Sequence, residues 1–193
     1  MKRQISFEQY RTIDLTILLA VLAVCQLLTH LAVSVWFPEQ LYVASPVAGL
    51  TALVMMRWGG YSAVHALLGG VLYAALCGGS WRHILIYGIG NLVSLSALIM
   101  LKKPGKERVR TSGFLSLMFG LCVQVTMWLG RFAMAVLLGD GVSAAFGFIT
   151  TDVLSGLFTL LIVWVIRRID GLFEDQKHYL LRMERERQAE RRE

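Results

Sequence analysis

The sequence predicts an all-α, polytopic membrane protein with six transmembrane helices and both termini in the cytoplasm. The first observation behind this prediction is composition: 56% of the 193 residues are hydrophobic and 17% are charged, whereas a soluble domain has about 45–50% apolar and about 25% charged residues. The second is a series of apolar runs long enough to cross a hydrocarbon core about 30 Å thick. The third is the clustering of basic residues between those runs.

The apolar runs predict helices rather than spanning strands, because none alternates with a period of two residues. Turn-forming or charged segments separate them. The first run is too long for the core of a signal peptide and has no small-residue cleavage site, so we expect a retained helix. The predicted spans are residues 14–36, 42–56, 61–77, 81–101, 113–138 and 142–166.

The basic residues predict the orientation of the chain. If the six spans cross the membrane in alternating directions, 17 of the 19 lysines and arginines lie on the same side of it, and only Arg82 and Arg131 do not. The positive-inside rule makes that side cytoplasmic, and such clustering explains the net charge of +6 better than nucleic-acid binding does. We expect two parts: a six-helix transmembrane domain over 1–168 and a charged cytoplasmic helix over 169–193. That helix is either solvated or docked on a partner or on the anionic leaflet.

Polar side chains inside a membrane are costly unless they face a bundle interior, a partner or a cavity. On the last three predicted spans such side chains recur at helical spacing, so that those of one span share one face. With a rise of about 1.5 Å per residue, most of them fall in the outer half of the membrane or at its midplane. They are His83, Tyr87 and Asn91 on the fourth span, Gln124, Trp128 and Arg131 on the fifth, and Thr151, Asp152 and Ser155 on the sixth.

These faces predict an outward-opening cavity for a small organic ligand. Aromatic rings would stack on a planar compound, Arg131 would bind a carboxylate or phosphate, and Asp152 would accept from an amine or ring N–H, which suits a zwitterionic or carboxylated ring. The alternative is that Arg131 and Asp152 pair with each other. The aromatic residues expected on the cavity walls are Tyr87, Trp128, Trp36 and Trp81. Trp36 and Trp81 also fit a belt of aromatic residues at the membrane interface.

Further polar residues extend or limit this cavity. Gln26, His30 and Tyr73 fall at depths that allow them to join it. His65 falls in the inner half of the membrane, which indicates a structural hydrogen bond between helices.

Motifs of catalysis and nucleotide binding are absent from the sequence. There is no Walker A loop, HExxH or Gly-x-Ser-x-Gly, and Ser155 has no histidine clearly at its level. The three cysteines lie singly in apolar runs, without the spacing of a metal site. We therefore expect no enzyme activity, no metal and no cofactor held by this chain.

The size, the six spans and the polar stripes resemble the S components of energy-coupling factor transporters, the substrate-binding membrane subunits that capture vitamins in prokaryotes. The segment Tyr87-Gly88-Ile89-Gly90-Asn91 and the smaller residues Ala20, Ala23 and Val24 of the first span carry the resemblance. It implies uptake of a micronutrient, a vitamin or a related small organic molecule, across the plasma membrane of a prokaryote. It also implies two kinds of partner, a transmembrane coupling subunit and cytoplasmic ATPases that use the ATP.

The resemblance also implies roles for particular residues. The first span would face the coupling subunit through Ala20, Ala23 and Val24, although the Ala-xxx-Ala common in the family is here Ala20 followed by Val24. Residue 2 is lysine, whereas metal-specific members have histidine there, so an organic substrate is expected. Residues 36–40 would form part of a lid, and the substrate would lie near His83, Tyr87, Asn91, Gln124, Trp128, Arg131, Thr151, Asp152 and Trp36.

A second interpretation is a structural membrane subunit of a cell-shape or assembly complex, in which the polar stripes bind partner helices. Such a protein needs no cavity. The shared depth of the stripes on the fourth, fifth and sixth spans separates the two interpretations, because a ligand pocket requires it and a partner interface does not.

Overall fold

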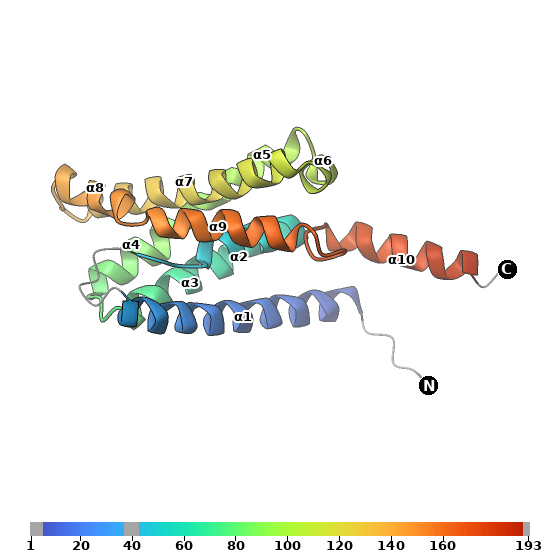
Figure 1. The fold of residues 1–193 in the computed structure, drawn as a ribbon, viewed down its shortest axis with the longest axis horizontal. Coiled ribbons are helices and arrows are strands. Elements are labelled where there is room, and N and C mark those ends of the chain that lie inside the picture. The colour runs from blue at the N-terminus through green and yellow to red at the C-terminus, as the bar shows by residue number, and fades with distance from the viewer. Residues whose placement is uncertain (1–5, 37–42, 191–193) are drawn as a thin grey trace.

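The computed structural model describes residues 6–36 and 43–190, and all regular structure in these ranges is helical. The helices form an elongated bundle, and the start of α1 lies at the same end of it as α10 (Figure 1). The helices are α1 (Phe7–Trp36), α2 (Val47–Trp58), α3 (Ser62–Leu76), α4 (Trp81–Asn91), α5 (Leu98–Lys102), α6 (Lys106–Thr111), α7 (Gly113–Leu137), α8 (Val142–Thr150), α9 (Val153–Ile166) and α10 (Gln176–Glu190), with 3₁₀ turns η1 (Gly59–Tyr61) and η2 (Leu92–Ala97).

Five helical segments of the described chain are long and apolar enough to cross a membrane, against six predicted. The second of them, Val47–Leu76, contains α2, η1 and α3. It reverses direction where Gly59 adopts a left-handed φ of 60°, a conformation that favours glycine. As a result α3 packs beside α2, with Gly69 so close to Val47 that an added Cβ would lie 2.9 Å from the valine Cγ1.

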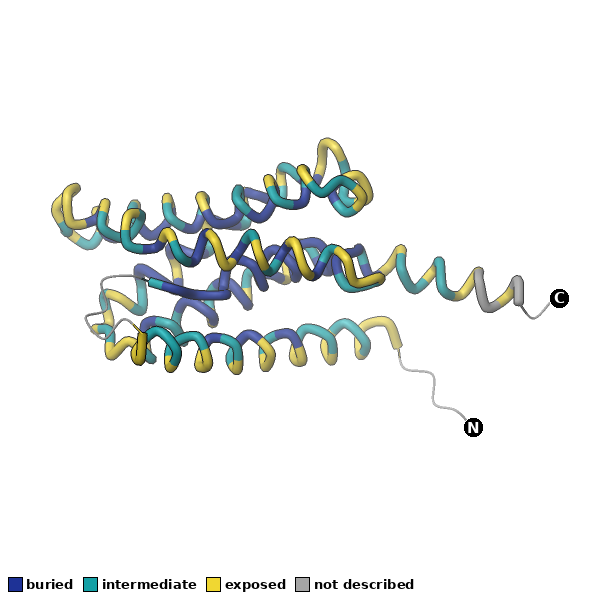
Figure 2. The backbone as a smooth tube through the Cα atoms, in the orientation of Figure 1, coloured by how far each residue is buried: buried dark blue, intermediate teal, exposed yellow. Residues whose placement is uncertain are grey.

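The centre of the bundle is α2, all twelve of whose residues are buried. The tube in Figure 2 shows it as a continuous buried segment, while α1 is buried along one side only. On α1 the buried residues are Leu18, Leu22 and Gln26, spaced four apart, and apolar side chains on its other faces are exposed. In a membrane those exposed apolar side chains meet lipid or a partner helix.

The predicted spans 81–101 and 142–166 are found as the apolar helical segments Trp81–Lys102 and Val142–Ile166, but the helical geometry of both is irregular. The 81–101 span becomes α4, η2 and α5, and the 142–166 span breaks between α8 and α9. At the second break the Thr151 carbonyl accepts from the Val43 N–H at 2.8 Å, so a chain segment before α2 takes the place of a helical donor. Asp152, which follows, turns its carboxylate toward α7, and the backbone leaves helical geometry there.

Glycines allow α4 to lie against both of its neighbours. A Cβ on Gly70 of α3 would overlap the carbonyl of Tyr87, and a Cβ on Gly130 of α7 would overlap that of Gly90. These backbone approaches are closer than any side chain permits. They place the polar face of α4 directly between α3 and α7.

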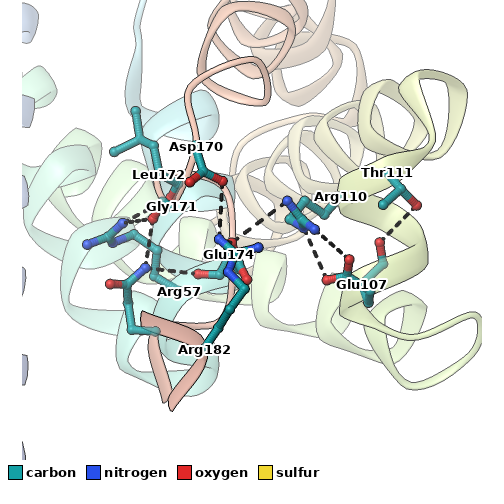
Figure 3. A network of polar contacts seen from close by, with 10 residues as sticks. Arg57, Glu107, Arg110, Thr111, Asp170, Gly171, Leu172, Glu174 and Arg182 are labelled. Carbon is teal, nitrogen blue, oxygen red and sulfur yellow. Dashed lines mark hydrogen bonds and ion pairs between the residues drawn. The ribbon is translucent and has the colours of Figure 1, made fainter. Parts of the chain in front are cut away.

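At the end where α1 begins, the segment between α9 and α10 packs onto the bundle, whereas the sequence predicted a charged helix over 169–193. Phe173, Glu174 and Gln176 are at most 5% exposed. Arg57 donates to the carbonyls of Gly171 (2.9 Å) and Leu172 (3.1 Å), as Figure 3 shows. Only beyond this anchored turn does α10 extend away from the bundle (Figure 1).

Ion pairs at this end shift two carboxyl pKa values. The hydrogen bond from Arg110 lowers the pKa of Glu107 below its ordinary value (Figure 3). Burial raises the pKa of Asp175, but the hydrogen bond and charge of Lys106, whose Nζ lies 2.6 Å from Oδ2, outweigh burial and leave the pKa lowered. The Arg110–Glu107 contact lies within α6, and the Lys106–Asp175 pair links α6 to the segment before α10.

Candidate ligand cavity and its polar floor

A cavity of about 400 Å³ opens between α1, α3, α4 and α8. Its lining residues include the end of α1 and the start of α4. These elements lie at the end of the bundle opposite α10 (Figure 1). Its size is that of sites that enclose small organic molecules. The side chains with functional groups or rings on its wall include His30, Tyr73, His83, Tyr87, Phe148 and Thr151.

Aromatic rings form one side of this cavity. The rings of Tyr73 and Tyr87 lie 4.7 Å apart between centroids and are tilted by 46°. Phe148 of α8 meets Tyr87 edge to face at 5.7 Å, and its ring lies 6.2 Å from that of His83. Such a set of rings offers faces and edges on which a planar ring can pack.

Hydrogen-bonding groups on the wall are hydroxyl, phenol, thiol and imidazole groups. His83 Nδ1 lies 3.1 Å from Ser80 Oγ, which leaves its other ring nitrogen available. His30 Nδ1 lies 4.0 Å from Cys77 Sγ, a weak contact. None of the described residues on the wall is an Asp, Glu, Lys or Arg.

Beneath the cavity a buried carboxylate gathers three donors. Asp152 Oδ2 accepts from Arg131 Nη1 at 2.5 Å, from Trp128 Nε1 at 2.7 Å and from Gln124 Nε2 at 3.0 Å. Asp152 and Gln124 are fully buried, and Arg131 is 2% exposed. The three donors come from one face of α7, at the spacing of successive turns. All three bind Oδ2, while the buried Oδ1 has no hydrogen-bond partner among the described residues.

The same network reaches α4 and α3. Arg131 Nε donates to Asn91 Oδ1 at 2.8 Å, and Asn91 Nδ2 donates to the Ala66 carbonyl at 3.2 Å. The Arg131 guanidinium lies over the Tyr87 ring, with Cζ 4.6 Å from the centroid. Tyr87 therefore separates the buried ion pair from the cavity, with the guanidinium on one side of its ring.

The predicted site residues thus divide into three groups. His83, Tyr87 and Thr151 line the cavity, while Asn91, Gln124, Trp128, Arg131 and Asp152 form the polar floor below it. Trp36 is 74% exposed at the end of α1 and is not among the residues that line the cavity. Of the expected lid, residues 37–40 lie outside the described residues.

Arg131 and Asp152 pair with each other in the structure, which is the alternative that the sequence left open beside ligand binding. On α1, Ala20 and Val24 are exposed and Ala23 is half-buried. The expected interface residues therefore lie on or beside the outward face of the helix.

Sequence reasoning did not identify Phe148 or the other α8 residues on the wall. Ala144, Phe148 and Asp152 are spaced four apart, as are Gly147 and Thr151. These α8 residues lie on the same helix face as Asp152 or Thr151, so following that face toward the start of the span would have identified them. Their side chains are apolar, and the search for polar residues therefore missed them.

The fold and the cavity define a class: an all-helical chain with five membrane-length apolar segments and a ligand-sized hollow at one end, the pattern of a multi-pass membrane protein. Comparison of the chain with protein-family models, with curated proteins and with solved structures finds no match.

Proposed function

We propose that this protein is the membrane-embedded substrate-capture subunit of an ATP-driven transporter that takes up a small organic molecule. The proposal includes six membrane crossings, in which α2 and α3 cross separately, and both termini in the cytoplasm of a prokaryote. The observation that carries it is the cavity of about 400 Å³ with aromatic and hydrogen-bonding walls above a buried polar floor.

The wall chemistry favours an uncharged ligand with a planar ring. Arg131 and Asp152, the two charged residues for which the sequence suggested a zwitterionic or carboxylated ligand, pair with each other. None of the described wall residues is an Asp, Glu, Lys or Arg. Tyr73, Tyr87 and Phe148 supply ring contacts, and His83, Thr151 and His30 supply donors and acceptors. A neutral heteroaromatic compound with a few polar substituents satisfies both sets.

Energy must come from partners in this proposal, because the sequence has no ATP-binding motif. The outward face of α1 suits a membrane partner: Ile17, Val21, Val24 and Leu28 are 41–60% exposed, with the small Ala20 among them. Small residues allow close approach of helices in a membrane. We assign this face to the coupling subunit.

Native mass spectrometry of the purified protein, before and after denaturation, tests the proposal by detecting a copurified small molecule. His83→Ala removes an exposed wall group without opening the core, and His178→Ala on α10 is the matched control. Loss of one hydrogen bond and one ring contact is expected to weaken retention about tenfold. An empty wild-type protein that copurifies with membrane partners lacking ATPases would favour the structural interpretation instead.

The proposed orientation can be tested separately with Cys77, which is exposed and lines the cavity. In a chain whose Cys25 and Cys122 are replaced by serine, a membrane-impermeant maleimide is expected to label Cys77 in intact cells. Labelling that requires permeabilised cells would reverse the orientation. A bound ligand should slow the labelling.

A further inference from the structure

A second polar hollow, of about 150 Å³, lies at the opposite end of the bundle, beyond the last apolar residue of α9. Three arginines border it: Arg110 of α6, and Arg167 and Arg168 directly after α9. The volume is several times the roughly 30 Å³ that a water molecule occupies in the liquid. The hollow does not depend on the function proposed for the cavity.

Arg167 is the unusual member of this group. Its Nε and Nη1 atoms are buried and have no hydrogen-bond partner among the described residues. The side chain is held between Trp164, whose ring centroid lies 5.0 Å from Cζ, and Gly113, where an added Cβ would come within 2.7 Å of Nη1. Buried donors of a charged group are expensive to leave unpaired, so an absent acceptor is indicated.

The acidic residues nearby are already engaged. Asp170 lies 3.2 Å from Arg182, and Glu174 lies 3.1 Å from Arg182 and 3.8 Å from Arg110 (Figure 3). Neither Arg167 nor Arg168 forms an ion pair with any described residue. The guanidinium of Arg168 lies over the same Trp164 ring at 4.5 Å, so two uncompensated positive charges converge there.

The backbone adds to this positive potential. Gly113 is the first residue of α7, a helix of 25 residues, so the Arg167 guanidinium lies beside the N-terminal end of this helix. A helix N-terminus carries a partial positive charge that favours an anion. With α9 ending at Ile166, the site lies where an apolar span meets the aqueous boundary, the depth of lipid phosphates.

We propose that Arg167, assisted by Arg168 and the start of α7, binds a phosphate group, supplied either by an anionic lipid or by free phosphate. Arginine matches phosphate because its planar guanidinium presents parallel donors. The bound group would compensate the charge of the Arg167 guanidinium, which forms no ion pair with any described residue.

Titration of the purified full-length chain with phosphatidylglycerol and, separately, with inorganic phosphate, followed by native mass spectrometry, tests the proposal. Arg167→Gln is expected to weaken binding about tenfold or more. Arg108→Gln is the matched control, because Arg108 is exposed at the same end, outside the hollow, and also loses one charge. A lipid adduct identifies the membrane as the source, and an adduct with inorganic phosphate alone identifies the soluble anion.

Two further variants keep the test decisive if Arg167→Gln folds poorly. Gly113→Ala retains every charge but pushes the Arg167 guanidinium aside, and Arg168→Gln leaves Arg167 in place. Both are expected to weaken binding. The proposal is overturned if wild type binds neither probe, if the variants bind as wild type does, or if Arg108→Gln weakens binding equally.

Discussion

Removal of the Asp152 carboxylate is expected to be among the most destabilising single changes in this protein. Asp152→Ala deprives three donors, on Arg131, Trp128 and Gln124, of one shared acceptor. An interhelical hydrogen bond in a membrane protein contributes about 0.6 kcal/mol on average, so three account for about 2 kcal/mol. Leaving the Arg131 guanidinium, 2% exposed, without its counter-ion raises the expected loss to about 3–5 kcal/mol.

Unfolding in mixed micelles with increasing SDS, followed by circular dichroism, measures this loss. Asp140→Ala is the control: Asp140 pairs with Arg82 at 2.8 Å, but the two side chains are 26% and 39% exposed, so about 1 kcal/mol or less is expected. The double variant with Arg131→Met should be more stable than Asp152→Ala alone, because no charge remains stranded. The reasoning fails if Asp152→Ala costs no more than Asp140→Ala, or if the double variant loses the sum of the two single losses.

Two further predictions concern close packing and acid sensitivity. Gly70→Ala should lower the free energy of unfolding by about 1–3 kcal/mol in the same assay, because its methyl would overlap the Tyr87 carbonyl. Gly147→Ala, whose methyl meets open space, should lower it little. Equal losses in the two variants would contradict this packing. Since the pKa of Asp175 is lowered in the folded state, its pair with Lys106 should stabilise the fold above pH about 3.9, and this stabilisation should be lost as the pH falls through the folded-state pKa. Hydrogen exchange of residues 170–180 should therefore become faster as the pH falls through this range. The Lys106→Gln variant should not show this pH dependence.

The helical class and the inward direction of the polar faces were predictable because both depend on local periodicity. Asn91, Gln124 and Arg131 each lie on the face of a helix that their spacing indicated, and all three are buried. Whether Arg131 would meet a ligand or Asp152 was not predictable, because that depends on distances between α7 and the α8–α9 break. No helical period encodes those distances.

Helix interruptions were missed for a related reason. Hydropathy is continuous through residues 142–166, so nothing in composition marks the break at Asp152. The break depends on a donor from Val43, more than a hundred residues away in sequence. The fold-back within Val47–Leu76 was marked locally, by the adjacent glycines Gly59 and Gly60.

The bond from Val43 to Thr151 has a mechanical consequence for the cavity. The segment before α2 is attached at two points: Val43 to the end of α8, and Ser45 to Gln26 of α1 through a hydrogen bond of 2.7 Å. Val43 and Thr151 both line the cavity. A displacement of α8 that widens the cavity must therefore either break the Val43 bond or move residues 43–46 with it. The cavity wall and this segment are thus mechanically coupled.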